Sequence, residues 1–114
     1  MNYSEFKKTY PWTVKKYPGT TSLFKENMNE TIGSFETVNY EKRGSSWKET
    51  DRSTAEMTRA NYFNCVDAIP FFRNLGGKEK VSLSYTFYGY IPVELSSISP
   101  DGKNKTVRKF SFKA

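Results

Sequence analysis

The chain has 114 residues and a formal net charge of +6, with 18 Lys and Arg against 12 Asp and Glu. This length supports one hydrophobic core and excludes two ordinary domains. Aromatic residues make up 17% of the chain, and because each buries a large area, they favour a folded domain over a disordered chain. We therefore predict a single domain over residues 1–114.

Several classes of chemistry are excluded by residues that the chain lacks. It contains no His and a single cysteine, Cys65. Ser-His-Asp and Cys-His pairs, His-ligated metal sites and zinc fingers cannot be built without those residues. No glycine-rich segment has the spacing of a phosphate-binding loop. We expect no catalytic residue, no metal and no cofactor, and a protein that is not an enzyme.

The sequence also bears on the compartment. Its first residues, Met1–Glu5, lack the apolar stretch of a signal peptide, and no apolar segment reaches the roughly 20 residues that span a bilayer. The lone Cys65 cannot form an internal disulfide, which is typical of a reducing compartment. We expect a cytoplasmic protein without membrane contact.

Short helices are predicted near the N-terminus. Ser4 is a suitable N-cap for a helix over Glu5–Tyr10, which Pro11 ends or bends because the residue before proline avoids the α region. Pro18-Gly19 predicts a turn, and a second short helix follows over Leu23–Met28.

The middle of the chain predicts a hairpin and then a helix. Between Thr31 and Asp51 a β-tolerant pattern surrounds a turn at Lys42–Ser46. Ser53-Thr54-Ala55-Glu56 fits a capping box and predicts that the central helix starts there. The apolar positions at helical spacing, which we expect to face the sheet, are Ala55, Tyr62, Phe63, Val66 and Ile69.

Proline and glycine residues mark the end of this helical region. Pro70 predicts either a kink or the start of a second short helix ending at Leu75. Gly76-Gly77 then predicts a left-handed stop.

The C-terminal third predicts an antiparallel β-meander from Val81 to Phe112. Val81, Leu83, Tyr85 and Phe87 alternate with polar residues, which predicts one apolar strand face. Gly89 permits a turn, and Ile91, Val93 and Leu95 continue the alternation. Pro100 and Gly102 predict a three-residue loop that places Ser99 opposite Lys103.

This register divides the last hairpin into two faces. It places Glu94 opposite Arg108, Pro92 opposite Phe110 and Tyr90 opposite Phe112. One face is then aliphatic and available to a helix, whereas the aromatic face is left for the N-terminal segment or a partner. The whole pattern predicts an α+β fold, with an antiparallel sheet of four to five strands packed on one central helix and short N-terminal helices.

Basic and aromatic residues interleave in two segments, 6–17 and 103–110. Lysines neutralise phosphates and exposed aromatic rings stack on bases, so these segments predict a binding surface. In the alternative interpretation, the aromatic residues dock the N-terminal segment on the sheet and the lysines keep the protein soluble. The candidate residues are Lys7, Lys8, Tyr10, Trp12, Lys15, Lys16, Tyr90, Arg108, Lys109, Phe110 and Phe112.

Three stretches, Met57–Asn64, Phe71–Gly77 and the region from Tyr85-Thr86 to Ser99-Pro100-Asp101-Gly102, resemble a family of small uncharacterised proteins from phages and mobile elements. The resemblance covers about the C-terminal half and assigns no function to any residue. It implies a viral protein that binds host machinery, including defence nucleases.

Three functions remain open. The first is an accessory protein that binds and modulates or inhibits a host protein complex. The second is binding of single-stranded DNA or RNA, and the third is a homo-oligomeric structural protein that pairs through a strand edge or an aromatic face. Arg108 is the only arginine in the two basic segments, and because phosphate and base recognition favour arginine, we place protein binding first.

Overall fold

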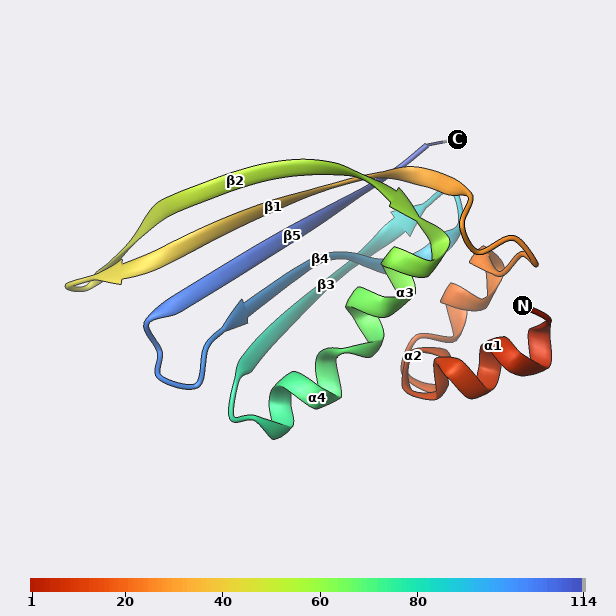
Figure 1. Cartoon of the computed structure of the whole chain (residues 1–114), viewed down its shortest axis with the longest axis horizontal. Helices are drawn as coiled ribbons and strands as arrows, with labels where there is room; N and C mark the ends of the chain where they lie inside the picture. Colours follow the sequence, from red (N-terminus) through yellow and green to blue (C-terminus); the bar gives the residue numbers. More distant parts are fainter. Residues whose placement is uncertain (114) are drawn as a thin grey trace.

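The computed structural model describes residues 1–113 and confirms the α+β fold. Five antiparallel strands form one sheet in the order β2-β1-β5-β4-β3. The helices α3 and α4 lie along one face of this sheet, with the N-terminal helices beside α3 (Figure 1). The elements are α1 (Tyr3–Thr9), α2 (Pro11–Lys16), the 3-10 helix η1 (Pro18–Leu23), β1 (Thr31–Arg43), β2 (Ser46–Thr58), α3 (Arg59–Asp67), α4 (Ile69–Asn74), β3 (Lys78–Thr86), β4 (Gly89–Ile98) and β5 (Asn104–Phe112).

The predicted first hairpin is present, but its second strand is longer than the sequence indicated. Gly44 closes the turn with a left-handed φ of 63°. β2 then continues through Ser53 and Glu56, which lie opposite Thr37 and Ser34 of β1. The helix predicted from the capping box is therefore wrong at its start, because backbone pairing with β1 outweighs the local capping signal.

The central helix begins at Arg59. Thr58 is its N-cap, and the Thr58 hydroxyl accepts a hydrogen bond from the backbone N–H of Asn61 at 3.1 Å. Of the predicted helix face, Ala55 lies exposed on β2 instead. The other four predicted residues are buried in the core, namely Tyr62, Phe63, Val66 and Ile69.

The stop signals after this helix are confirmed. Pro70 lies in the first turn of α4, where its missing N–H costs no hydrogen bond. Gly76 adopts a left-handed φ of 92°, and its N–H donates to the carbonyl of Arg73 at 2.9 Å.

The N-terminal helices differ from the prediction in their boundaries. Asn2, not Ser4, caps α1, since its side chain accepts from the Glu5 N–H at 2.8 Å. The expected helix over Leu23–Met28 is absent from the described residues, and η1 ends at Leu23. In η1 the hydroxyls of Thr20, Thr21 and Ser22 each donate to the backbone carbonyl three residues earlier. Such local side-chain bonding is typical of a tight turn and not of a longer α-helix.

The predicted register of the last hairpin is wrong by one residue. Glu94 lies opposite Lys109 and Leu95 opposite Arg108. The Ser99 N–H donates to the Asn104 carbonyl at 2.9 Å, so the loop between these two residues has four residues instead of three. A shift by one residue exchanges the two faces of a strand, and every side chain of β5 therefore lies on the face opposite to the one predicted.

Candidate binding surfaces

The aromatic residues of the N-terminal basic segment are packed inside the protein. Tyr10 is buried, its ring centroid lies 5.3 Å from that of Phe63, and its hydroxyl donates to the Asn64 side chain at 3.0 Å. Trp12 is half-buried and packs edge-on against Tyr17. These contacts support the interpretation that the aromatic residues dock the segment. The predicted lysines of this segment remain exposed, namely Lys7, Lys8, Lys15 and Lys16.

The predicted aromatic face of the last hairpin does not form, because of the register shift. Phe110 is buried, with its ring centroid 5.0 Å from that of Tyr62, and Phe112 is half-buried with its centroid 5.3 Å from that of Tyr62. Arg108 lies beneath α3 and α4. Lys109 lies on the face of the sheet away from these helices, which we call the open face. The structure thus separates the predicted site residues.

The largest exposed aromatic cluster lies at the turn between β3 and β4. Tyr85 is 85% exposed, Phe87 is 76% exposed and Tyr90 is 52% exposed. We call these three residues the aromatic tip. Tyr85 pairs with Tyr90 across the hairpin, and their ring centroids are 4.7 Å apart. Of the residues predicted from the sequence, only Tyr90 belongs to this tip.

The backbone of the tip is held in place by short-range contacts. The Tyr88 N–H donates to the Thr86 hydroxyl at 3.0 Å, and that hydroxyl donates to the Gly89 carbonyl at 2.9 Å. The Ser22 hydroxyl of η1 lies within hydrogen-bond distance of the Tyr88 carbonyl as well as of the Gly19 carbonyl. The Tyr88 ring packs inward against Phe112. The exposed rings are therefore presented on a structured turn, which lowers the entropic cost of binding.

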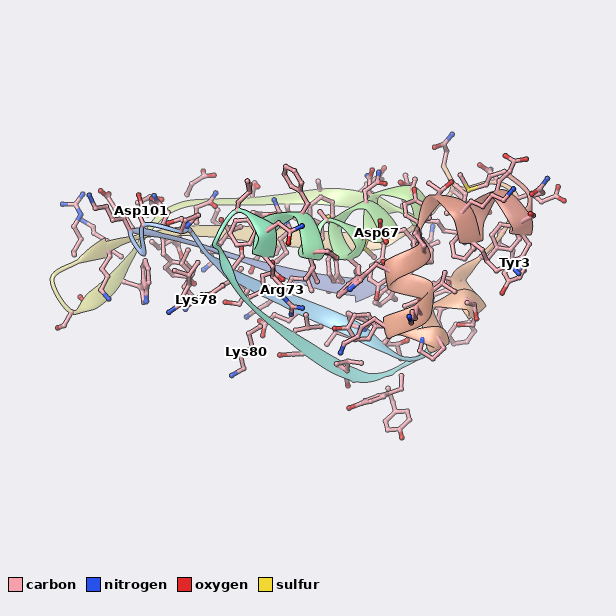
Figure 2. The ribbon with its side chains drawn as sticks, turned by 90° about the horizontal axis from the view of Figure 1, so that it is seen from below. Tyr3, Asp67, Arg73, Lys78, Lys80 and Asp101 are labelled. Atoms are coloured by element: carbon pink, nitrogen blue, oxygen red, sulfur yellow. The ribbon has the colours of Figure 1, made fainter. Side chains whose placement is uncertain are left out.

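A second candidate surface lies on the open face. A groove of about 350 Å³ is lined by lysines from two strands, Lys80, Lys105 and Lys109, which we call the basic groove. Glu94 is the only acidic residue in its lining. Lys80 points away from the helices in Figure 2, whereas Arg73 of α4 points toward the sheet.

Aromatic side chains adjoin the basic groove. The Lys105 ammonium lies 5.4 Å from the ring centroid of Tyr40 and 5.8 Å from that of Trp47. Lys42 lies 5.5 Å from the same Trp47 ring. These distances fit cation–π contacts, which orient the lysine ammonium groups over the sheet. Of the residues predicted from the sequence, only Lys109 lines this groove. The sequence pattern did not bring it together with Lys80 and Tyr40, because these residues come from strands that are far apart along the chain.

Two further features bear on what these surfaces can do. In residues 1–113, no group of three or more His, Cys, Asp or Glu side chains is placed to hold a metal ion. None of the helices described is long and apolar enough to cross a membrane.

Comparisons with protein-family models, with curated proteins and with solved structures found no match.

Proposed function

We propose that this protein acts by binding another protein through the aromatic tip. The observation that carries the proposal is the exposure of three large rings on a hydrogen-bonded turn. Exposed apolar patches on soluble proteins commonly mark interaction sites, and tyrosine is enriched among the residues that dominate binding energy. We place the partner among host protein complexes in the cytoplasm, the class that the sequence resemblance to phage proteins implies.

The chemistry of the tip defines the partner surface. The three residues carry two hydroxyls and no formal charge, so the complementary surface is an apolar pocket with a few hydrogen-bonding groups. Tyr85 and Tyr90 already contact one another, which reduces the side-chain entropy lost on binding. A rigid aromatic projection of this kind favours insertion into a preformed pocket of the partner.

The test compares three forms of the protein in affinity purification from host cells. The forms are the wild type, the tip variant Tyr85→Ser/Phe87→Ser/Tyr90→Ser and a control variant, Phe71→Ser/Leu75→Ser. The control also removes exposed apolar side chains, but from α4 and its C-cap residue. We expect a partner that is retained by the wild type and the control and is lost by the tip variant.

Two results contradict the proposal. A partner that all three forms retain equally places the interface elsewhere. A dimer in light scattering that becomes a monomer only in the tip variant shows that the tip joins two copies of this chain. The thermal unfolding midpoints of the three forms are measured first, so that a loss of binding is not confused with a loss of folding.

The basic groove supports a second candidate function, the binding of single-stranded nucleic acid along the open face. Its lysines can neutralise phosphates, while Tyr40 and Trp47 lie beside them as stacking surfaces. Fluorescence anisotropy with short labelled RNA and DNA tests this function. We expect affinity that falls as salt rises, and at least a roughly tenfold loss of affinity in Lys80→Glu/Lys105→Glu.

A matched control separates the groove from the overall charge. Lys7→Glu/Lys8→Glu changes the net charge by the same amount on exposed α1 residues. An equal loss of affinity in both variants means that only the net charge matters. An absence of binding by the wild type at about 50 mM salt excludes this function.

A further inference from the structure

A pocket of about 280 Å³ lies between the helices and the sheet, apart from both the aromatic tip and the basic groove. Its apolar walls come from the α3–α4 region and from β4, namely Ala68, Ile69, Phe72 and Leu95. Its polar walls come mainly from the three strands β3, β4 and β5, namely Glu79, Ser97, Thr106 and Arg108, together with Cys65 of α3. The pocket thus combines an apolar lining with one carboxylate and one guanidinium.

Glu79 is the most unusual residue of this pocket. Its side chain is only 5% exposed, and neither carboxylate oxygen accepts a hydrogen bond from the residues that the structure describes. The nearest cation is Arg73, a half-exposed side chain whose Nε lies 3.4 Å from Oε2. Burial raises the pKa of Glu79, and Arg73 lowers it less. Because buried polar groups are almost always hydrogen-bonded, this carboxylate has unused acceptor capacity.

Arg108 supplies the opposite charge from the other side of the pocket. Glu79 of β3 pairs with Ser97 of β4, whereas Arg108 of β5 pairs with Leu95 of β4. The two charged residues therefore lie on the strands either side of β4, two interstrand spacings of about 4.8 Å apart and offset by two residues along β4. Within residues 1–113, Arg108 forms no ion pair, with Glu79 or with any other acid.

We propose that this pocket binds a small ligand that carries a primary amine at one end and a carboxylate at the other, joined by a short apolar chain. The ammonium group donates hydrogen bonds to the Glu79 oxygens, which accept none from the described residues, and the ligand carboxylate accepts hydrogen bonds from Arg108. The apolar chain lies on Leu95, Ile69 and Phe72. The volume is slightly below the usual range for drug-sized ligands, so it suits a ligand of amino-acid size.

Calorimetric titration of the full chain with three probes of matched chain length tests this proposal. The probes are 6-aminohexanoate, hexanoate and pentylamine, which carry both charged groups, only the carboxylate and only the amine. We expect 6-aminohexanoate to bind at least roughly tenfold more tightly than either of the others, since only it engages both Glu79 and Arg108. Equal affinity for all three probes, or no heat of binding for any of them at millimolar concentrations, overturns the proposal.

Variants then assign each end of the ligand. Glu79→Gln removes the advantage of 6-aminohexanoate over hexanoate, and Arg108→Gln removes its advantage over pentylamine. Lys109→Gln is the control, since Lys109 is the neighbour of Arg108 but lies on the open face. Wild-type affinity in both pocket variants overturns the assignment. Should a variant fail to fold, chemical-shift changes in the wild type on adding 6-aminohexanoate decide the location, and changes confined to residues outside the pocket also overturn it.

Discussion

Glu94 of β4 lies directly opposite Lys109 of β5, with 3.9 Å between Oε1 and Nζ. The ion pair itself contributes little, because both side chains are partly exposed to water. The register of β4 against β5, which this ion pair marks, has a larger effect on the structure. It turns Phe110 into the core and Arg108 toward the pocket beneath α3 and α4. The properties of both residues follow from this one alignment.

Phe110→Ala is expected to destabilise the protein strongly. The Phe110 ring packs against Tyr62 and Phe35, so its removal leaves a cavity and lowers the free energy of unfolding by about 3–5 kcal/mol. Urea denaturation measures the loss. Phe87→Ala is the control, and because that ring is exposed we expect a change within about 0.5 kcal/mol. A large loss in the control would show that the tip packs on the protein.

Gly33→Ala is expected to disrupt the pairing of β1 with β5. A Cβ atom at this position would lie 1.9 Å from the backbone carbonyl oxygen of Ser111, so the two strands must separate locally. We expect the free energy of unfolding to fall by about 1–3 kcal/mol. Gly44→Asn serves as the comparison, since its neighbourhood is open and asparagine tolerates the left-handed conformation. Equal losses in the two variants would contradict the steric explanation.

Glu79→Gln is expected to stabilise the protein at neutral pH. Burial raises the pKa of Glu79 in the folded state above its unfolded value. Folding therefore favours the protonated form, and stability falls as pH rises from the unfolded pKa through the folded pKa. Glutamine removes this cost, so the variant should exceed the wild type in unfolding free energy at pH 7 to 8. The difference should disappear below about pH 4, where the carboxyl is protonated in both states. A difference independent of pH would exclude titration as its cause.

Tyr62→Phe is expected to remove a buried hydrogen bond without removing the ring. The Tyr62 hydroxyl donates to the backbone carbonyl of Pro92 at 2.8 Å, and the substitution removes this buried hydrogen bond. We expect about 1–3 kcal/mol less free energy of unfolding. Tyr40→Phe is a suitable control, because the half-buried Tyr40 hydroxyl makes no hydrogen bond within residues 1–113, and its removal should change stability little.

The sequence predicted the elements whose signals are local. Gly44, Pro70 and Gly76 each lie where a turn or helix end was expected, since backbone conformation at these residues is restricted regardless of the rest of the fold. The capping box over Ser53–Glu56 was misleading because those residues pair with β1, a contact that no local pattern reports. The loop after Ser99 was misjudged by one residue because a Pro-Asp-Gly turn fits both loop lengths.

The candidate site was less predictable than the fold, for a geometric reason. Alternation predicts which residues share a strand face, but not how far the helices extend over that face. Tyr85 and Phe87 were placed on one apolar strand face with Val81, and they lie exposed at the end of the hairpin, beyond a register irregularity at Ser82. Phe110 was expected to bind a partner and is buried instead.

The central position of β5 has a consequence for how the chain folds. Each of the hairpins β1–β2 and β3–β4 can form from neighbouring residues, but only β5 joins them, since it lies between β1 and β4 in Figure 1. During synthesis both hairpins emerge before β5, each with one unpaired edge that it will later share with that strand. Long-range pairing of this kind slows folding and leaves these edges open to association with other chains until β5 is in place.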